Sequence, residues 1–467
     1  MSLQSCRFIR HDEFVPFKSK GNAMLRMPMI VAISISAISF AAISQVSYES
    51  TVVMKESAAT GACLEVVSNV SLSGTKSERV APGSKPTFSA IKAAWTSRYR
   101  EKIVELDSSK QVVTTARRYS DTTLEKTASN TTRRTVLRQS AQRIVIRRVD
   151  RENTIFSPDA PLTTQELDLL RAEVFTPALA GFLAAKPVKV GDRWQPAADA
   201  ASELTGIDPI QSGAINCTLR EIKSAATGAV ARVALSGTVS GPSEQGPSRQ
   251  TVEGYFLFDL DHQLITSLVF SGQSEILNDD GKVVQKLEGR YELTRRPAIE
   301  DPRLSDSELA QLTLKPNAEV TGLLFDDSDL GVRFLHPRNW ELASVSKNVI
   351  QLDEPTGGRL LVTVDPTPAP NAEKLRADLL TWLGSQKAKV KDAGRVQGTS
   401  TSDSRKADHF TVHATVGEKD RQWNYWIVRS GERAATVAAN VIASRADALT
   451  KDVESIARSF EFLPKSN

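Results

Sequence analysis

Alternation of apolar and polar residues runs through most of residues 64–296, and it limits how this chain can fold more than any other feature. It is visible in RIVIRRVD (Arg143 to Asp150) and in GYFLFDLD (Gly254 to Asp261). Successive side chains of a β-strand point to opposite faces, so the apolar residues of the second segment would share one face. The pattern therefore predicts strands with one buried face.

Turn sequences separate these predicted strands. LNDDGK (Leu277 to Lys282) ends on glycine between two long runs, and DLDHQ (Asp259 to Gln263) separates the preceding pair. Tight turns of this kind join antiparallel neighbours. We therefore expect residues 60–296 to form a long-stranded antiparallel β-rich domain, within an α+β fold for the whole chain.

One helical segment interrupts the strands, from Thr163 to Leu183. Thr163 and Glu166 have the spacing of a capping box, and Pro177 is expected to break or kink the helix. Leu167, Leu170 and Val174 fall on one face. Because such an apolar stripe must be buried, we expect this segment to pack on the open face of the sheet.

The last third of the chain has a different organisation. Residues 297–318, which contain most of RRPAIEDPRLSD, lack an apolar period and predict an extended linker. An α+β domain is expected at residues 319–464, with a helix starting near Asn371 and a final helix capped by Ser444. Its predicted strands are 332–335, 349–352, 360–364, 410–414, 423–429 and 434–441.

The stretch GVRFLHPRNWEL carries a family resemblance through Phe334, His336, Pro337 and Trp340. With the element order that follows it and the terminal SFEF, it resembles the PsbP-like α+β sandwich. This resemblance implies a domain used for docking or structure, with Trp340 in its core and no shared catalytic apparatus. The β-rich part resembles exported bacterial envelope domains of the LolA type, in which a curved sheet wraps around helices.

An uncharged run, MPMIVAISISAISFAAISQVSY (Met27 to Tyr48), predicts export. Arg26 precedes it, and Ala42-Ile43-Ser44 is a small-residue site that a signal peptidase could cleave. Residues 1–48 are therefore interpreted as a leader with a signal peptide, the alternative being an uncleaved membrane anchor. The expected location is periplasmic or extracellular.

Cysteine usage fits an oxidising compartment. Removal of the leader would leave Cys63 and Cys217, which could form a disulfide. Spacing alone does not establish that bond.

Known catalytic and metal-binding signatures are absent from the sequence, which contains no G-x-S-x-G, Walker, H-E-x-x-H, G-x-G-x-x-G or C-x-x-C motif. His409 and His413 would suit zinc on a helix, but their segment predicts a strand, which would hold them about 13 Å apart. In RQWNYWIV, Trp423 and Tyr425 would face one side of a strand and Trp426 the other. We therefore expect no metal, no cofactor and no enzymatic activity.

Basic residues are concentrated between Lys85 and Arg151, where 16 Lys or Arg face 6 Asp or Glu, whereas the whole chain has a net charge of only +4. Arginine binds phosphate and carboxylate groups through paired hydrogen bonds, so the segment is a candidate anion-binding surface, the alternative being a solvated basic face. The residues proposed for it are Arg117, Arg118, Arg133, Arg134, Arg143, Arg147 and Arg148.

These features predict an exported bacterial envelope protein with a non-catalytic binding, docking or structural role. Its expected partner is an envelope protein, an anionic polymer or a lipid, and export argues against nucleic acid. Membrane contact is expected through residues 27–48 if the leader stays uncleaved. One alternative is a carrier that holds a lipid or apolar ligand in the β-rich domain, which requires a continuous cavity. Another is a hydrolase with two facing acids in a deep cleft.

Overall fold

The structure, a computed structural model, describes residues 51–77, 87–128, 131–225, 228–400 and 406–464. The leader prediction for residues 1–48 lies outside these residues. The chain divides into two compact units, with the division between Val320 and Thr321. Each unit is rich in antiparallel strands, as the alternation predicts for residues 64–296.

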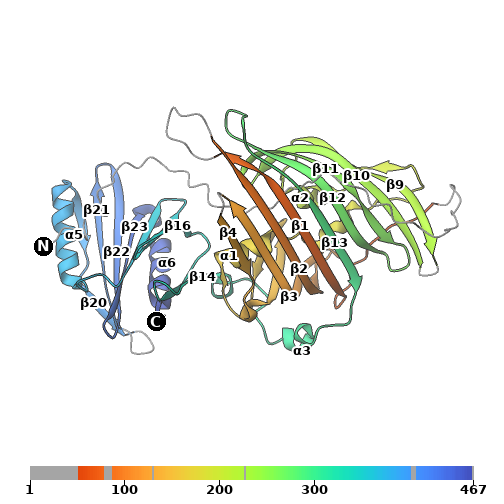
Figure 1. The fold of residues 1–467 in the computed structure, drawn as a ribbon. Coiled ribbons are helices and arrows are strands. Elements are labelled where there is room, and N and C mark those ends of the chain that lie inside the picture. Colours follow the sequence, from red (N-terminus) through yellow and green to blue (C-terminus); the bar gives the residue numbers. More distant parts are fainter. Residues whose placement is uncertain (1–50, 78–86, 129–130, 226–227, 401–405, 465–467) are drawn as a thin grey trace. The chain divides into compact units, whose positions relative to one another are not determined.

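Twelve strands of the first unit form one antiparallel sheet (Figure 1). They are β1 (Cys63–Ser77), β2 (Phe88–Leu106), β3 (Val112–Ala128), β4 (Thr131–Val136), β5 (Arg143–Val149), β6 (Glu152–Phe156), β8 (Arg193–Trp194), β9 (Ser212–Ala225), β10 (Gly228–Ser243), β11 (Gly246–Asp259), β12 (Leu264–Leu277) and β13 (Val283–Pro297).

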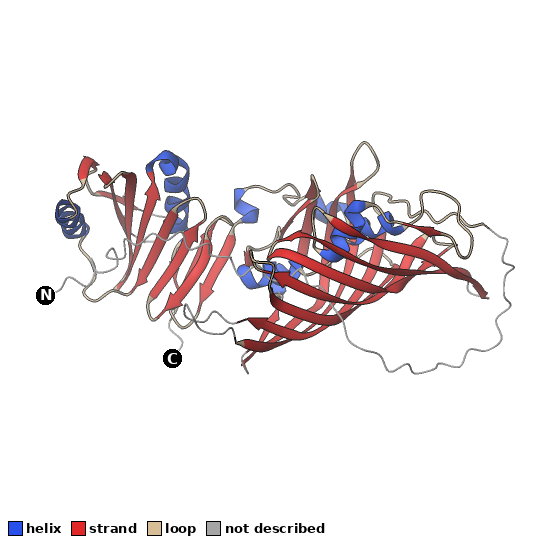
Figure 2. Ribbon diagram, turned by 90° about the horizontal axis from the view of Figure 1, so that it is seen from above, coloured by secondary structure: helices blue, strands red, loops and turns tan. Residues whose placement is uncertain are grey.

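The order of the strands is β6-β5-β3-β2-β1-β13-β12-β11-β10-β9-β8, with β4 paired to β3. Two meanders, one from each half of the unit, are thus joined where β1 pairs with β13, with Val70 opposite Tyr291. Both predicted turns lie between strands, after Asp259 and after Leu277. The sheet curves, and the helical segments between β6 and β9 lie on its inner side (Figure 2).

The inner side holds two helices and one 3₁₀ segment. Helix α1 (Thr164–Arg171) follows the short strand β7 (Leu162–Thr163) and begins with the predicted capping box, in which Thr163 and Glu166 exchange hydrogen bonds. The 3₁₀ segment η3 (Thr176–Phe182) and helix α2 (Ala198–Thr205) follow. The helical segment expected over residues 163–183 is broken as predicted, but earlier than expected, since α1 ends at Arg171 and Pro177 lies in the first turn of η3.

The predicted linker is more ordered than expected. Within residues 297–318 lie η4 (Pro302–Leu304) and α3 (Asp306–Leu309), and they bury Leu304 and Leu309 against Ala116 of the first unit. Lys102 of β2 donates to Asp306 at 2.6 Å and to the carbonyl oxygen of Leu304 at 3.0 Å. Leu304 and Leu309 thus hold this part of the chain against the sheet. The proline content and charge that predicted an extended linker did not indicate this packing.

The short helix α4 (Ala318–Thr321) spans the division, and the second unit that follows it is a layered α+β arrangement. Its main sheet has the order β16-β17-β18-β23-β22-β21-β19, with β20 paired to β21. These strands are β16 (Glu341–Ser346), β17 (Val349–Glu354), β18 (Gly358–Val364), β19 (Lys389–Ala393), β20 (Gln397–Ser400), β21 (Lys406–Val416), β22 (Lys419–Ser430) and β23 (Arg433–Ile442).

Two separate cores cover the faces of this main sheet. Helix α5 (Ala372–Ser385) packs on one face with Phe410 and Trp423. Helix α6 (Ala446–Ser459) packs on the other, together with β14 (Leu323–Asp327), β15 (Val332–His336) and β24 (Glu461–Phe462). The cap predicted at Ser444 is wrong, because residues 443–445 form the 3₁₀ segment η5 (Ala443–Arg445) and Arg445 precedes the helix without a side-chain cap.

Candidate functional site

A buried ionic cluster lies between the inner face of the curved sheet and the segment that follows α1. Arg117 on β3 is completely buried, and it donates to Glu101 on β2 at 2.8 Å and to Glu173 at 2.9 Å. Ser97 and Tyr119 donate to the same Glu173 carboxylate at 2.7 and 2.8 Å. The cluster therefore ties α1 and η3 to the centre of the sheet through charge-assisted hydrogen bonds.

Burial changes the acid–base properties of this cluster. Loss of solvation raises the pKa of Glu173, and the Arg117 charge only partly opposes that rise. A second ion pair, in which Arg295 of β13 donates to Glu56 at 2.6 Å, is less buried, because the Glu56 side chain is partly exposed to solvent. Both Glu173 oxygens accept from protein donors, so this carboxyl is engaged in holding the fold together. The carboxylate of Glu203 on the same face is engaged in the same way, since it accepts from Arg148 and from the backbone N–H of Phe175, each at 2.7 Å.

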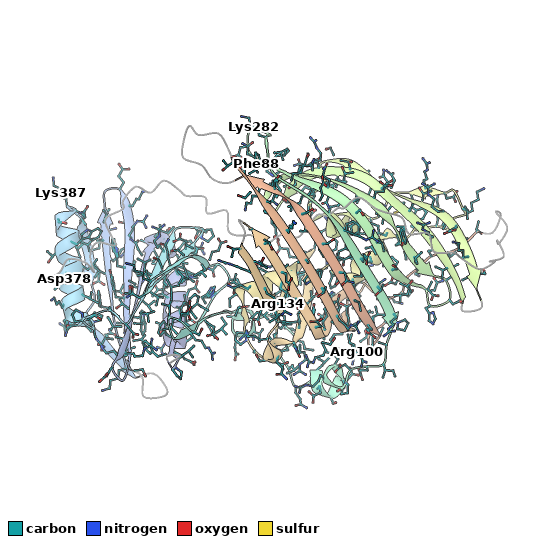
Figure 3. The ribbon with its side chains drawn as sticks, viewed as in Figure 1. Phe88, Arg100, Arg134, Lys282, Asp378 and Lys387 are labelled. Carbon is teal, nitrogen blue, oxygen red and sulfur yellow. The ribbon has the colours of Figure 1, made fainter. Side chains whose placement is uncertain are left out.

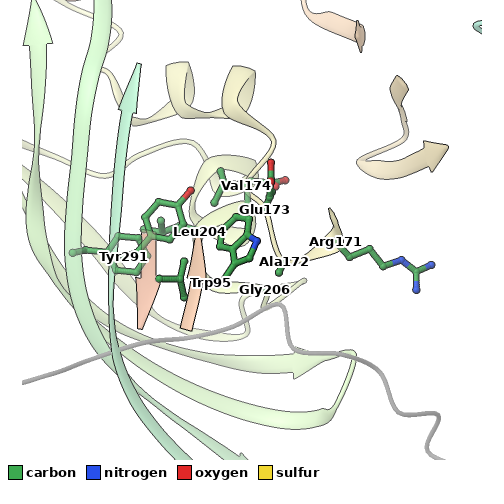
Figure 4. A pocket seen from close by; sticks show the side chains of 11 residues that line it. Trp95, Arg171, Ala172, Glu173, Val174, Leu204, Gly206 and Tyr291 are labelled. Carbon is green, nitrogen blue, oxygen red and sulfur yellow. The ribbon is translucent and has the colours of Figure 1, made fainter. Parts of the chain in front are cut away.

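A small cavity borders this cluster, under the end of α1 and the end of α2 (Figure 4). Its free volume is about 30 Å³. It is lined by Val70, Trp95, Arg171, Ala172, Glu173, Val174, Glu203, Leu204, Gly206, Phe270 and Tyr291. Ligand pockets for drug-sized molecules measure roughly 300–1,000 Å³, so this cavity accepts only a small group.

Trp95 supplies the cavity with a free hydrogen-bond donor. Its side chain is 1% exposed, and its indole nitrogen Nε1 has no hydrogen-bond partner among the described residues. Buried indole N–H groups usually find an acceptor. Tyr291 stands beside it and stacks on Phe270, while Arg171 extends away from these rings (Figure 4). The arrangement can accept a small group that carries a hydrogen-bond acceptor and an apolar flank.

The seven arginines proposed for anion binding do not form one surface. Arg117 binds two glutamates, as described above. Among the others, side-chain hydrogen bonds join Arg118 to Gln142, Arg143 to Asp159, Arg147 to Glu105 and Arg148 to Glu203. Arg133 and Arg134 lie exposed on β4, next to each other in the sequence and so pointing to opposite faces; Figure 3 labels Arg134. The joint anion-binding prediction is corrected, because acids from distant segments neutralise most of the cluster.

The predicted disulfide is also corrected: Cys63 and Cys217 are both free thiols. Cys63 begins β1 and Cys217 lies in β9, and four strands, β13, β12, β11 and β10, stand between them in the sheet. Neighbouring strands are about 4.8 Å apart, whereas a disulfide needs Cα atoms within about 7 Å of each other. Burial raises the pKa of the Cys217 thiol to about 12.

The sequence motifs of the second unit serve packing. Trp340 is fully buried and donates to Asp452 of α6 at 3.0 Å, which confirms its predicted core position. Nδ1 of the buried His336 lies 3.0 Å from the carbonyl oxygen of Pro337. Trp423 and Trp426 lie in different cores, on opposite faces of β22 as expected.

His409 and His413 lie in strand β21, as predicted, and His409 stacks on Trp426. Within the described ranges no group of three or more His, Cys, Asp or Glu side chains could hold a metal ion. Within the same ranges, every helix is too short or too polar to cross a bilayer.

Trp95, Glu173 and Tyr291 were not singled out from the sequence. A signal was present in AAWTSRYRE, where Trp95, Ser97, Tyr99 and Glu101 occupy alternate positions, so polar and aromatic residues share the inward face of β2. Their acidic and basic partners come from other segments, and spacing within one strand does not reveal them.

Comparisons with known proteins give likenesses of fold only. No protein-family model and no curated protein matches the chain. A solved structure of cyanobacterial PsbP from Synechocystis is 17% identical, covers 30% of this chain and 92% of its own, and has a TM-score of 0.25. A lipovitellin structure, which concerns lipid–protein interactions in that protein, is 10% identical and covers 53% of this chain with a TM-score of 0.29. The match covers 26% of the length of that lipovitellin chain.

Proposed function

We propose that this chain is an exported bacterial envelope protein with a non-catalytic role, in which the β-rich unit binds a small polar ligand on the inner face of its sheet. The single observation that carries the binding role is the free N–H of Trp95, which is buried at a cavity beside a satisfied ionic cluster. Leaving such a donor without an acceptor costs free energy, and a bound acceptor would remove that cost. In this proposal the second unit, with its PsbP-like element order, docks the protein on an envelope partner.

The volume of the cavity argues for a small ligand over a lipid. About 30 Å³ of free volume has room for roughly two water-sized groups, whereas a lipid needs a continuous apolar cavity. The inner face is instead filled by its own side chains, including Leu268, Phe270 and Leu293. A carrier of acyl chains would have to displace α1 and α2 from the sheet.

The binding role is tested by native mass spectrometry of the full chain and of the Trp95→Phe variant. Phenylalanine keeps a ring at this position but removes the N–H. The proposal expects a small-molecule adduct on the wild-type chain and its loss from the variant. Equal adducts on both chains, or none on the wild type after gentle purification, would contradict binding at this cavity.

Export is tested separately by fractionating bacteria that express the full chain with a C-terminal tag. The wild-type chain is expected in the osmotic-shock fraction, with a mass that starts after Ser44. A variant with Ile35→Arg and Ile38→Arg, which breaks the apolar run, is expected to stay in the cytoplasm at full mass. A wild-type chain that also stays there would exclude export.

A further inference from the structure

A second cavity lies along the same inner face and shares Gly206 with the first. Its free volume is about 20 Å³. It is lined by Thr205, Gly206, Ile207, Ser243, Glu244, Gln245, Ser248, Gln250, Ser274 and Ile276. Six of these ten residues carry a hydroxyl or an amide and Glu244 carries a charge, while apolar atoms make up the larger part of the cavity surface.

Gln250 of β11 is the unusual member of this lining. Its side chain is 1% exposed, and neither its amide nitrogen Nε2 nor its oxygen Oε1 has a hydrogen-bond partner among the described residues. Neighbouring polar groups are satisfied: Ser243 and Ser248 lie 2.8 Å apart, and Gln285 donates to Gln245 at 3.2 Å. Buried amides are normally hydrogen-bonded, so a free donor and a free acceptor on one amide point to a missing ligand.

The geometry of an amide end limits what can satisfy it. Nε2–H and Oε1 lie side by side, so the complementary group must offer an acceptor and a donor next to each other. Two adjacent hydroxyl groups meet this requirement, since each hydroxyl can both donate and accept. A free volume of about 20 Å³ has room for one or two water-sized groups, so in this arrangement only the two hydroxyl groups would enter the cavity and the sugar ring would stay outside it.

The remaining lining favours a neutral polyol over an anion. Glu244 is the charged residue of the cavity, and its carboxylate would repel a phosphate or a second carboxylate. Ile207 and Ile276 supply apolar contacts of the kind that the C–H faces of a sugar can cover. We propose that Gln250 binds two neighbouring hydroxyl groups of a sugar, and that the inner face of the β-rich unit is a carbohydrate site. This inference rests on the proposed binding role and names its ligand class.

Affinity electrophoresis of the full chain tests the site. The probes are a glucan, a mannan and a galactan, each intact or cleaved by periodate and then reduced, a treatment that destroys adjacent hydroxyl pairs and leaves a soluble polymer. The methyl glycosides of the three sugars, added as competitors, distinguish recognition of a single sugar from recognition of the polymer. At least one intact polymer is expected to slow the migration of the chain. The cleaved form of the same polymer is expected to leave its migration unchanged.

Two variants locate the effect. Gln250→Leu keeps the approximate volume of the side chain but removes both hydrogen-bonding atoms, and at least a tenfold loss of affinity is expected. Gln273→Leu is the matched control, because Gln273 lies on the opposite face of the neighbouring strand β12, where it donates to Glu288. Its affinity is expected to match that of the wild type. The thermal midpoint of Gln250→Leu should not fall, since an apolar side chain has no unsatisfied amide to bury, so loss of binding would not reflect unfolding.

Several results would overturn the carbohydrate site. These are no retardation by any intact polymer, equal retardation by the cleaved polymers, or equal affinity of Gln250→Leu. An adduct that Trp95→Phe removes, found together with no retardation by sugars, would reject this ligand class and leave the proposed binding role standing. Retardation that Gln250→Leu abolishes and Trp95→Phe leaves unchanged would support the carbohydrate site and would reject ligand binding at the first cavity.

Discussion

Arg117 on β3 and Glu173 beyond α1 are joined by a fully buried ion pair with an Nη1–Oε2 distance of 2.9 Å. The same guanidinium also holds Glu101 of the neighbouring strand. One arginine thus joins two strands of the sheet to the segment packed on its inner side. The cost of desolvating these charges is offset only while all the partners are present.

Replacing Arg117 with methionine is therefore expected to destabilise the first unit by about 3–5 kcal/mol, because two buried carboxylates would lose their counter-charge. Urea unfolding followed by circular dichroism measures the change. Arg134→Met is the control, since Arg134 is exposed and lies 3.9 Å from Glu125, and its effect should stay within about 0.5 kcal/mol. Equal midpoints for the two variants would show that the Arg117 pair contributes little.

The strands of this unit could be predicted from sequence because their signal is local. In Gly254 to Asp261 the alternation of apolar and polar residues shows which face of the strand each side chain takes. The turn at residues 277–282 is set by the residues within it, so both features can be recognised from a short segment. The pairing of β1 with β13 joins segments more than 200 residues apart in the chain, and alternation does not encode such a pairing.

The candidate site was hidden from sequence for a related reason. Arg117 and Arg148 give the same signal as the exposed Arg133, and only the tertiary structure brings Glu173 and Glu203 to them. A free donor such as Trp95 Nε1 is recognised only when all its neighbours are known. Helix capping at Thr163 and the core position of Trp340 were predictable, because each depends on a short motif.

Trp340 provides a test of the second unit. It is fully buried between β15 and α6, so Trp340→Ala is expected to cost about 3–5 kcal/mol of stability. Trp382→Ala, at a partly exposed position of α5, should cost less. Chemical unfolding followed by the remaining tryptophan fluorescence compares them. A smaller loss for Trp340 than for Trp382 would contradict its role in the core.

Both thiols are expected to stay free even in protein recovered from an oxidising compartment. Without reductant, the denatured chain should bind maleimide at both Cys63 and Cys217, as counted by intact mass. In the native chain Cys217 should react far more slowly than Cys63, since it is completely buried and burial keeps its thiol protonated. A mass two hydrogens lower, with neither residue modified, would show the disulfide that the structure separates.

Asp168 of α1 makes the stability of the first unit depend on pH. It is 9% exposed, and loss of solvation raises the pKa of its carboxyl from 3.8 to about 6, against the opposing charges of Arg171 and Lys126 and with help from Glu244. A raised pKa means that the folded state binds the proton more tightly than the unfolded state. This contribution is therefore fully present below about pH 4 and is lost as the pH rises through about 6.

The Asp168→Asn variant separates the contribution of the Asp168 carboxyl to the pH dependence of stability from that of the other titratable groups. A shift of about two pKa units corresponds to about 3 kcal/mol, so the variant is expected to gain up to that amount over the wild type near pH 8 and almost nothing near pH 4. Urea midpoints at the two pH values measure the gain. Asp121→Asn, at an exposed position of β3, should change little at either pH. A gain for Asp168→Asn that is equal at both pH values would mean that the neutral side chain packs better, and the carboxyl would then not titrate near pH 6.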